Sequence, residues 1–493
     1  MCTPSRRLLS GTFKLVSSAG VVGAVVALTG TAWSGEGPKK DDPFKNDEVF
    51  NITDVIQVPG ANLSSFDISW YDPALNKYFL ADRNNKAIEV IDGATHSLTQ
   101  HVNSLYAGVN SAGNDFSGPD GVATVNNHTE VWVGDSNTCL AVTNCDGSDL
   151  AHTAGPGRVW VQDSTTLAVK TSLQLGGAAN PILVGGKSRA DEFCTDPNNH
   201  VVMITSPAES PPYVTFISTK TYTVLGTLIF DGSSAAGHAP LKATNGLEQC
   251  GWSPKTGKFY QNVPAVNGPD GEDTVPGAVA VINPATRMFE TSFTVPIADC
   301  AGPQGMAIGP DDQILLGCNA ASIPGGHRNV VVIDANSGTV LKTIADLGGA
   351  DEVWFNPGDG HYVIASCNTP CRTVPGTGEE GPELLGFVDS NGLRLDHAVT
   401  VAFHNSATAK LPGNPRVIHS AAANSKTGEV YLPIPATGGN APQFDPTLCD
   451  SFGEGITRTG NPSAATGCIV ILKARHDDRS RVAKERPKDD NQE

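Results

Sequence analysis

The sequence is poor in features that mark several common protein classes. Aromatic residues make up 6 % of its 493 residues, and lysine plus arginine total 33 against 51 aspartate plus glutamate. No long stretch has the 3.6-residue periodicity of an amphipathic helix, which argues against a helical fold. The formal net charge of -18 argues against nucleic acid or anionic lipid as a partner, so we expect a cationic or neutral ligand. A serine-nucleophile elbow, a phosphate-binding loop, a CxxCH haem motif and a Rossmann fingerprint are also missing.

Apolar runs of membrane-spanning length are absent as well, and only the N-terminal region comes near one. Arg6 and Arg7 precede an apolar stretch at residues 21–28, and the small residue Ala32 follows it. This order is typical of an export signal, which we place at residues 1–32. Both general secretion and the twin-arginine route remain open. We therefore expect an exported, periplasmic or extracellular protein without a membrane span, and we expect a monomer.

Glycine and proline are abundant, with 53 and 34 residues, and this composition is typical of a turn-rich all-β fold. A segment of similar pattern recurs seven times, at intervals of about 50–70 residues. Each copy has a polar residue, a few apolar residues, a turn and a second apolar run. The copies begin at Asp67, Asp120, Asp191, Glu248, Gln304, Asp351 and His419. Repeats of this length built from strands predict a seven-bladed β-propeller.

The remaining segments complete the domain organisation. Residues 33–48 are predicted to be a linker, residues 49–474 the propeller, and residues 475–493 a disordered charged tail. The last blade has a third strand beginning at Cys468 and no fourth strand after it. We expect the apolar stretch FNITDVIQVP, which begins at Phe50, to pair with that blade and close the ring.

Eleven cysteines are present, and ten remain without Cys2, an even number that favours an oxidising compartment. Proximity in sequence favours three pairs, which are Cys139–Cys145, Cys367–Cys371 and Cys449–Cys468. Cys300 and Cys318 flank the first hairpin of one blade. Cys194 and Cys250 lie on the first strands of adjacent blades, where either a disulfide or two buried thiols would fit.

The first residues of the seven repeats are the candidate functional site. A propeller gathers such positions at one mouth of its channel, where the acidic side chains repel one another unless a cation lies among them. The predicted metal ligands are Asp67, Asp120, Asp191, Glu248, Gln304, Asp351 and His419. Their oxygen atoms favour Ca²⁺, with Mn²⁺ or Zn²⁺ as alternatives if His419 ligates. A solvated channel without a metal is the competing interpretation.

Further charged residues lie next to the ring positions or near the same mouth, and they bear on whether the mouth binds a metal ion. Arg189 and Arg416 come just before ring residues, where they can form ion pairs with the acids or bind substrate. Glu192 follows Asp191 and Glu352 follows Asp351, and side-chain alternation predicts that only one member of each pair faces the channel. Asp82 and Asp135 end second strands, where turn capping is the alternative to ligation. His152 and His327 precede third strands and could serve in acid–base chemistry.

Two family resemblances accompany these patterns. The phrases KYFLADRNNKAIEVID and RNVVVIDANSGTVLKTI resemble YVTN and NHL propeller repeats, a resemblance that covers nearly the whole mature chain. The phrases ATNGLEQCGWSPKTGKFY and GPDGVATVNNHTEVWVGD resemble blades of the gluconolactonase/senescence-marker-protein family. That second resemblance implies one divalent cation, bound at positions that match Asp67, Asp120 and Glu248 here, and the opening of sugar lactones. The family usually has six blades, and its liganding asparagine falls on Glu248.

Two functions therefore remain open. The first is a divalent-metal-assisted hydrolase or lactonase acting on a small molecule, with Glu248 or Glu192 as the catalytic base. The second is a non-catalytic binding or surface protein of the YVTN type, with a small-molecule or protein partner. A lyase for acidic sugars is a third possibility, which the scarcity of arginine and lysine at the mouth disfavours.

Overall fold

The computed structural model describes most of the predicted propeller. The described residues are 50–103, 105–110, 113–136, 157–175, 189–271, 274–318, 329–345, 347–366, 383–402, 418–436, 447–453 and 455–474. The export signal, the linker and the charged tail predicted from the sequence therefore lie outside the described residues. Within them, no helix is both long enough and apolar enough to cross a membrane.

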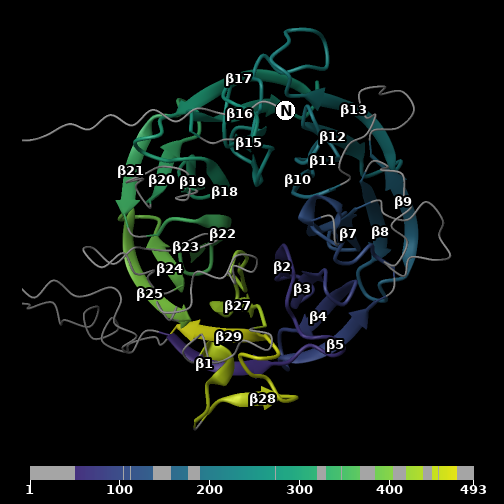
Figure 1. Ribbon diagram of the computed structural model, residues 1–493, viewed down its shortest axis with the longest axis vertical. Coiled ribbons are helices and arrows are strands. Elements are labelled where there is room, and N and C mark those ends of the chain that lie inside the picture. Colours follow the sequence, from purple (N-terminus) through teal and green to yellow (C-terminus); the bar gives the residue numbers. More distant parts are fainter. Residues whose placement is uncertain are drawn as a thin grey trace, which may run out of the picture. The chain divides into compact units, whose positions relative to one another are not determined.

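Seven β-sheets are arranged in a ring around one channel, which confirms the predicted seven-bladed β-propeller (Figure 1). The innermost strands are β2 (Ser69–Asp72), β6 (Val122–Val125), β10 (Phe193–Asp196), β14 (Cys250–Ser253), β18 (Pro303–Ile308), β22 (Ala350–Asn356) and β26 (Ala422–Ala423). The second strands are β3 (Lys77–Asp82), β7 (Glu130–Asp135), β11 (Val201–Ser206), β15 (Lys258–Val263), β19 (Gln313–Cys318), β23 (His361–Ser366) and β27 (Glu429–Ile434).

The outer half of each blade follows the same order. The third strands are β4 (Ala87–Asp92), β8 (Arg158–Asp163), β12 (Tyr213–Ser218), β16 (Gly277–Asn283), β20 (Asn329–Asp334), β24 (Glu383–Asp389) and β29 (Cys468–Ala474). The outermost strands are β5 (Ser97–Val102), β9 (Val169–Gln174), β13 (Thr223–Ile229), β17 (Met288–Val295), β21 (Val340–Ala345), β25 (Arg394–Ala402) and β1 (Phe50–Ile56). The remaining described elements are β28 (Thr457–Thr459) and the 3-10 turns η1 (Asn114–Phe116) and η3 (Leu448–Asp450).

Burial explains why the second and third strands are the clearest in the sequence. All six residues of β7, β11 and β27 are buried, because both faces of each sheet pack against neighbouring blades. Such strands show continuous apolar runs, such as VVMITS in β11, where a half-exposed strand would alternate. The outermost strands β9 and β13 are largely exposed or half-buried, which accounts for their mixed sequences.

The third strands end in a turn that is capped by the side chain of the last strand residue. Asp92 Oδ1 accepts hydrogen bonds from the backbone N–H groups of Ala94 at 3.0 Å and Thr95 at 2.9 Å. The equivalent residues cap the same turn in five other blades, namely Asp163, Ser218, Asn283, Asp334 and Asp389. Such caps replace backbone hydrogen bonds in a tight turn. The recurrent final aspartate is therefore a structural feature of the repeat.

The N-terminal strand closes the ring as predicted. Strand β1 pairs with β29 in antiparallel register, from Phe50 opposite Ala474 to Ile56 opposite Ile469. The short strand β28 then pairs with β1 in parallel. Strand β1 thus gives blade seven its fourth strand, and β28 adds a fifth. Pairing with β1 covers an edge of β29 that would otherwise expose unpaired backbone groups.

Three disulfides link described residues. Cys194–Cys250 joins the innermost strands of blades three and four, which settles the question left open by the sequence in favour of a bond. Cys449–Cys468 is confirmed as predicted, and Cys300–Cys318 connects the two residues that flank one hairpin. The predicted pairs Cys139–Cys145 and Cys367–Cys371 lie outside the described residues. The three bonds fit an oxidising compartment, while export itself stays a prediction.

Candidate functional site

The mouth of the channel contains a polar cavity of about 590 Å³. Six of the seven predicted ring residues line it, namely Asp67, Asp191, Glu248, Gln304, Asp351 and His419. Asp120 is fully buried next to this group and hydrogen-bonds to Arg83, which does line the cavity. The prediction that the repeats gather these side chains at one mouth is therefore correct for six positions, and Asp120 lies behind the wall.

A repeated backbone contact explains why the spacing in the sequence places these residues in a ring. In four of the seven ring residues, the backbone N–H group donates to a carbonyl at the end of the second strand of the same blade. The pairs are Asp67 to Ala81 at 2.9 Å, Asp120 to Gly134 at 2.9 Å, Asp191 to Thr205 at 3.1 Å and Glu248 to Asn262 at 3.2 Å. The same local fold thus recurs in four consecutive blades, and each blade presents one polar side chain at an equivalent place.

Two arginines cross-link three of the ring acids. The Arg83 guanidinium contacts the carboxylates of Asp67 and Asp120, and its side chain is only 3 % exposed. Arg189 Nη2 lies 3.0 Å from Asp67 Oδ2 and 2.9 Å from Asp191 Oδ2. The ion-pairing interpretation of Arg189 is therefore confirmed. These contacts leave Asp67 as the most strongly paired acid of the mouth.

Arg83 was not anticipated from the sequence. It is the charged residue directly after β3, one position beyond the expected turn cap Asp82. Asp82 Oδ1 does accept the N–H of Asn85 at 3.0 Å, which confirms its capping role. Asp135, the equivalent residue of blade two, accepts a hydrogen bond from the N–H of Ala107, in the segment that links blades one and two. A cation immediately after a second strand was the one available signal for Arg83.

His419 joins the same network from blade seven. Its Nε2 lies 3.3 Å from Asp67 Oδ1, and its ring stacks on Phe66 with centroids 4.8 Å apart. Burial opposes ionisation of Asp67, but Arg83, Arg189 and His419 together hold the pKa of that carboxyl well below its usual value. Asp67 is therefore ionised and fully engaged within the protein.

The other acids of the mouth are in the opposite state. Burial raises the pKa of Asp191 to about 7, although Arg189 opposes the change. Burial, together with the negative charge of Asp351, holds the pKa of Glu248 well above its usual value. Burial raises the pKa of Glu192 to about 8, and burial together with the negative charge of Glu192 holds the pKa of Glu352 well above its usual value. A ligand cation would favour the ionised form of each of these groups.

Glu192 and Glu352 correct one prediction. Both members of the pairs Asp191–Glu192 and Asp351–Glu352 line the mouth, where side-chain alternation predicted one of each. Alternation fails because β10 begins only at Phe193, after the first pair, and because the pairing of β22 with β23 shifts register between Ala350 and Val353.

Several buried acceptors at the mouth have no hydrogen-bond partner among the described residues. They include Asp191 Oδ1 and Gln304 Oε1, and the donor Arg189 Nε is also unmatched. No described lysine, arginine or histidine forms a salt bridge with Glu192, Glu248 or Glu352. Buried polar atoms are normally satisfied. The mouth therefore presents acceptor oxygens to whatever enters it.

The predicted metal site is only partly compatible with this arrangement. Among the described residues, no group of three histidine, cysteine, aspartate or glutamate side chains is arranged to hold a metal ion. Asp67, Asp120 and Asp191 already face arginines, so a cation would have to bind at Glu248, Gln304, Asp351 and His419. Oxygen donors of this kind suit a hard cation. The divalent cation stays a prediction, as do the catalytic roles of Glu248 and Glu192.

Some expected contributors cannot be placed. His152, His327 and Arg416 lie outside the described residues. Residues that were not expected at the mouth include Ser64, Ser65, Asn84 and Asn114, which lie on loops of blade one and of the segment after it. Their uncharged polar side chains add hydrogen-bonding groups to the rim.

Comparison with known proteins supports the fold. A chain from the crystal structure of the mitotic checkpoint complex superposes with a TM-score of 0.50 at 11 % sequence identity, covering 85 % of this chain and 97 % of that chain. The protein described here is therefore a β-propeller. No protein-family model and no curated protein matches the sequence. At this identity the likeness concerns the fold alone. The YVTN/NHL and gluconolactonase resemblances gain no support and enter below only as proposals.

Proposed function

We propose that this propeller is a binding protein whose mouth takes a small molecule that is positively charged or rich in hydroxyl groups. The observation that carries the proposal is an excess of carboxyl groups over cations among the described residues. Seven carboxyl groups lie at the mouth or, in the case of Asp120, directly behind its wall, against the guanidinium groups of Arg83 and Arg189. The seven are those of Asp67, Asp120, Asp191, Glu192, Glu248, Asp351 and Glu352.

Energetics explain why such a site favours this ligand class. A buried acceptor without a partner costs about 1–3 kcal/mol, and a ligand N–H or O–H group removes that cost. Asp191 Oδ1 and Gln304 Oε1 are two such acceptors. Cavities that bind small molecules combine a preformed shape with a few converging polar groups, as this one does.

Isothermal titration calorimetry tests the proposal with four probes: ethylenediamine dihydrochloride, xylitol, calcium chloride and sodium malonate. We expect at least one of the first three to bind and malonate not to bind. Glu248→Gln should weaken that binding about tenfold, the value of one hydrogen bond to a charged group. Asp270→Asn is the matched control, because this side chain is 83 % exposed and pairs only with Lys242 at 3.2 Å, so its affinity should match the wild type.

The calcium arm of the titration also examines the second candidate function, a metal-assisted lactonase. The position of Glu248 favours it, since this residue matches a ligand position of the gluconolactonase family and lies beside Gln304 and Asp351 in the cavity. A bound divalent cation would supply Lewis-acid activation of a carbonyl and of a water. Glu192, with its pKa raised to about 8, holds its proton at neutral pH and becomes a base only beside such a cation.

The outcomes separate the candidates. Near-stoichiometric metal in the desalted protein, measured by inductively coupled plasma mass spectrometry, together with turnover of lactones, would favour the hydrolase. Binding of the diamine or the polyol without metal would favour the binding protein. Malonate binding as tight as that of the diamine, or unchanged affinity in Glu248→Gln, would contradict the proposed role of the mouth.

A further inference from the structure

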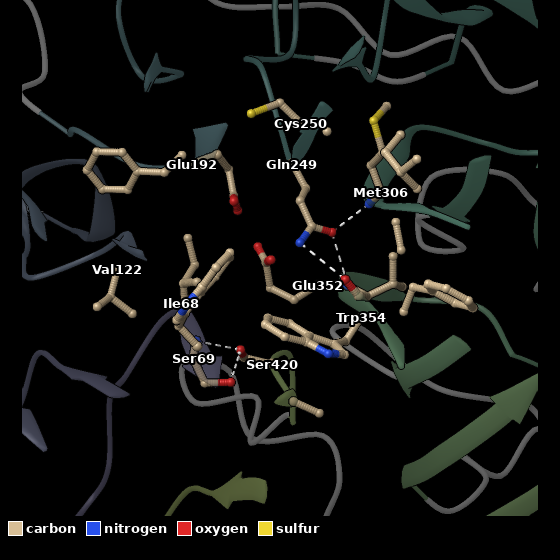
Figure 2. A pocket seen from close by; sticks show the side chains of 18 of the residues that line it. Ile68, Ser69, Val122, Glu192, Gln249, Cys250, Met306, Glu352, Trp354 and Ser420 are labelled. Atoms are coloured by element: carbon tan, nitrogen blue, oxygen red, sulfur yellow. Dashed lines mark hydrogen bonds between the residues drawn. The ribbon is translucent and has the colours of Figure 1, made fainter. Parts of the chain in front are cut away.

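A second cavity, of about 290 Å³, lies deeper in the channel (Figure 2). Glu192 and Glu352 line both cavities, so their carboxyl groups separate the polar mouth from this deeper space. Its other lining residues lie farther along the innermost strands than the ring residues do. Apolar side chains dominate its wall, namely Ile68, Trp70, Val122, Phe193, Met306, Ile308, Trp354 and Phe355. We call it the aromatic cavity.

Most polar groups of the aromatic cavity are satisfied within the protein. Ser69 and Ser420 hydrogen-bond to each other through their hydroxyl groups at 2.8 Å. Gln249 Oε1 accepts from the backbone N–H groups of Met306 and Val353, and its Nε2 donates to the Val353 carbonyl (Figure 2). These bonds lock the side chains in place. They leave the two glutamates as the polar groups with capacity for a ligand.

The two carboxyl groups point toward one another across the channel (Figure 2). The side chains of Glu192 and Glu352 are more than nine-tenths buried, with 6 % and 7 % of each residue exposed. No described basic side chain forms a salt bridge with either of them. Their oxygens can therefore accept hydrogen bonds from a cationic ligand, and hydrogen bonds that involve a charged group are stronger than those between neutral groups.

The tryptophans supply a complementary surface. Trp70 and Trp354 come from blades one and six, and their rings meet edge to face with centroids 5.1 Å apart. Trp70 Nε1 donates to Thr124 Oγ1 at 3.0 Å, which fixes the orientation of its ring. Both tryptophans are only half-buried although they lie on innermost strands. Aromatic faces of this kind attract organic cations as well as apolar groups.

We propose that the aromatic cavity binds an organic ammonium ion with one apolar ring, the nitrogen donating to Glu192 and Glu352 and the ring packing on Trp70 and Trp354. The volume fits such a ligand, since a cavity of about 150 Å³ accommodates benzene and this one is about twice as large. The site is distinct from the mouth, because Glu248 and Asp351 do not line it.

The proposal predicts that tight binding requires a ligand with both a positive charge and an apolar ring. The carboxyl groups discriminate against anions, and the apolar wall discriminates against small hydrophilic amines. A neutral molecule of the same shape keeps the packing but loses the charged hydrogen bonds and the cation–π attraction. We expect this loss to weaken binding about tenfold or more.

Four matched probes test this requirement by calorimetry and by quenching of tryptophan fluorescence. They are 2-phenylethylammonium, its uncharged isostere 2-phenylethanol, the anion 3-phenylpropionate, and ethylammonium, which lacks the ring. We expect 2-phenylethylammonium to bind at least about tenfold more tightly than each of the others. Equal affinity for 2-phenylethanol, or no binding of 2-phenylethylammonium, would overturn the proposal.

Variants then locate the bound probe. Glu352→Gln and Trp354→Leu should each weaken 2-phenylethylammonium about tenfold, while Glu248→Gln at the mouth should leave its affinity unchanged. Trp354→Phe serves if the leucine variant does not fold, since it keeps an aromatic face and should show a smaller loss with reduced quenching. Equal weakening in Glu248→Gln would place the ammonium at the mouth and overturn the proposal. The affinity of the aromatic cavity for 2-phenylethylammonium does not depend on whether the mouth binds any of its own probes. The proposal for the aromatic cavity and the proposal for the mouth can therefore be rejected independently.

Discussion

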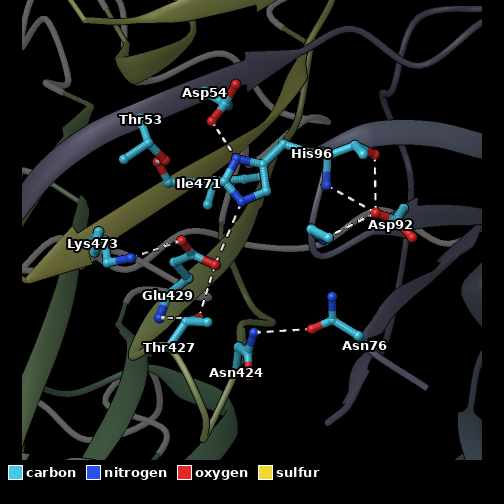
Figure 3. A network of polar contacts seen from close by, with 12 residues as sticks. Thr53, Asp54, Asn76, Asp92, His96, Asn424, Thr427, Glu429, Ile471 and Lys473 are labelled. Atoms are coloured by element: carbon cyan, nitrogen blue, oxygen red, sulfur yellow. Dashed lines mark hydrogen bonds and ion pairs between the residues drawn. The ribbon is translucent and has the colours of Figure 1, made fainter. Parts of the chain in front are cut away.

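Two charged networks in this propeller follow opposite rules. The first is the mouth, with its excess of carboxyl groups. The second, which we call the closure seam, consists of Asp54, His96, Glu429 and Lys473 (Figure 3). It joins the turn between β4 and β5 of blade one to β1, β27 and β29 of blade seven. Both networks are largely buried, yet they differ in how their acids are matched.

Every acid of the closure seam faces a matched partner. His96 Nδ1 contacts Asp54, and His96 Nε2 lies 3.4 Å from Glu429 Oε2. Glu429 also accepts from Thr427 Oγ1 at 2.8 Å and pairs with Lys473 at 3.2 Å. Burial opposes ionisation of Glu429, but the hydrogen bond from His96 and its other partners lower its pKa to about 2.

The comparison distinguishes charged residues that stabilise the fold from charged residues that are available to bind a ligand. In the closure seam each acceptor is satisfied and the carboxyl pKa is low, as expected where polar groups hold two blades together. At the mouth, Asp191 Oδ1 and Gln304 Oε1 have no hydrogen-bond partner among the described residues, and the carboxyl pKa values other than that of Asp67 are raised. Such a pattern concentrates at binding sites. The arginines of the mouth resemble the closure seam, because they form buried ion pairs with Asp67, Asp120 and Asp191.

Removal of Arg83 should produce the largest effect. Arg83→Leu leaves the buried carboxylate of Asp120 without its nearest cation, while Asp67 keeps its contact with Arg189 at 3.0 Å. Breaking a buried pair in this way costs about 3–5 kcal/mol of unfolding free energy. Urea denaturation measures the loss. Arg394→Leu is the matched control, because this arginine is 67 % exposed and its ion pairs are worth about 0–1 kcal/mol.

A double variant checks the cause of that loss. Adding Asp120→Asn to Arg83→Leu removes the carboxyl charge that has lost its nearest cation, so we expect part of the stability to return. If Arg83→Leu unfolds no more easily than Arg394→Leu, the mouth does not depend on its buried cation, and the distinction between the two networks is lost.

Glu248→Gln and Glu429→Gln form the second test, since the same substitution should have opposite signs in the two networks. The folded-state pKa of Glu248 is raised, so wild-type stability falls as pH rises above the unfolded value of 4.5. Glu248→Gln should therefore be more stable than the wild type at pH 8, by about 1–2 kcal/mol because the carboxyl lies partly in the water of the cavity. Glu429→Gln should be less stable than the wild type at that pH.

Thermal melting at pH 4.5 and pH 8 distinguishes the two cases. The stability gain of Glu248→Gln should shrink toward zero at pH 4.5, where the unfolded chain also binds the proton. A loss of stability in Glu248→Gln at pH 8 would mean that this acid has a structural partner, and it would move Glu248 into the same class as Glu429.

The sequence predicted the fold well because each blade repeats one local solution. The capped turns, buried second strands and backbone contacts at the ring depend on residues close in sequence, such as Asp92 with Thr95 or Asp67 with Ala81. Closure by the strand from Phe50 followed from counting strands in the last blade. The equivalent positions of Cys194 and Cys250 in adjacent blades left a disulfide and two buried thiols as alternatives, and the structure shows the disulfide.

The site was predicted less completely, because its chemistry depends on side chains that cross between blades. The long side chain of Arg83 reaches an acid of the next blade, and a pattern of one residue per blade contains no information on that reach. Glu192 and Glu352 were misjudged where strand geometry is irregular. The aromatic cavity combines Trp70 and Trp354 from non-adjacent repeats, and no spacing in the sequence relates them.

His96→Asn should produce the smallest effect and the one with the most distinctive pH dependence. His96 has a φ of 51°, a left-handed conformation that asparagine tolerates well, so the substitution removes the bridge without straining the turn. The hydrogen bond with Glu429 raises the His96 pKa above 6.5, so its contribution is complete below 6.5 and is lost as pH rises through the raised value. The contribution of Glu429, whose pKa is lowered, is complete above 4.5 and is lost as pH falls toward about 2. Both are therefore present between pH 4.5 and 6.5.

In that window we expect His96→Asn to lose about 1 kcal/mol of unfolding free energy, since the pair is partly screened by solvent. The difference from the wild type should shrink at both higher and lower pH. His128→Asn is the control, because His128 also has a positive φ, of 66°, but pairs with Asp72 alone and is 48 % exposed, so it should lose less. Urea denaturation at pH 3, 5.5 and 9 measures both variants. A pH-independent loss in His96→Asn would show that packing, rather than charge, holds blades one and seven together, because only the ionic contribution titrates.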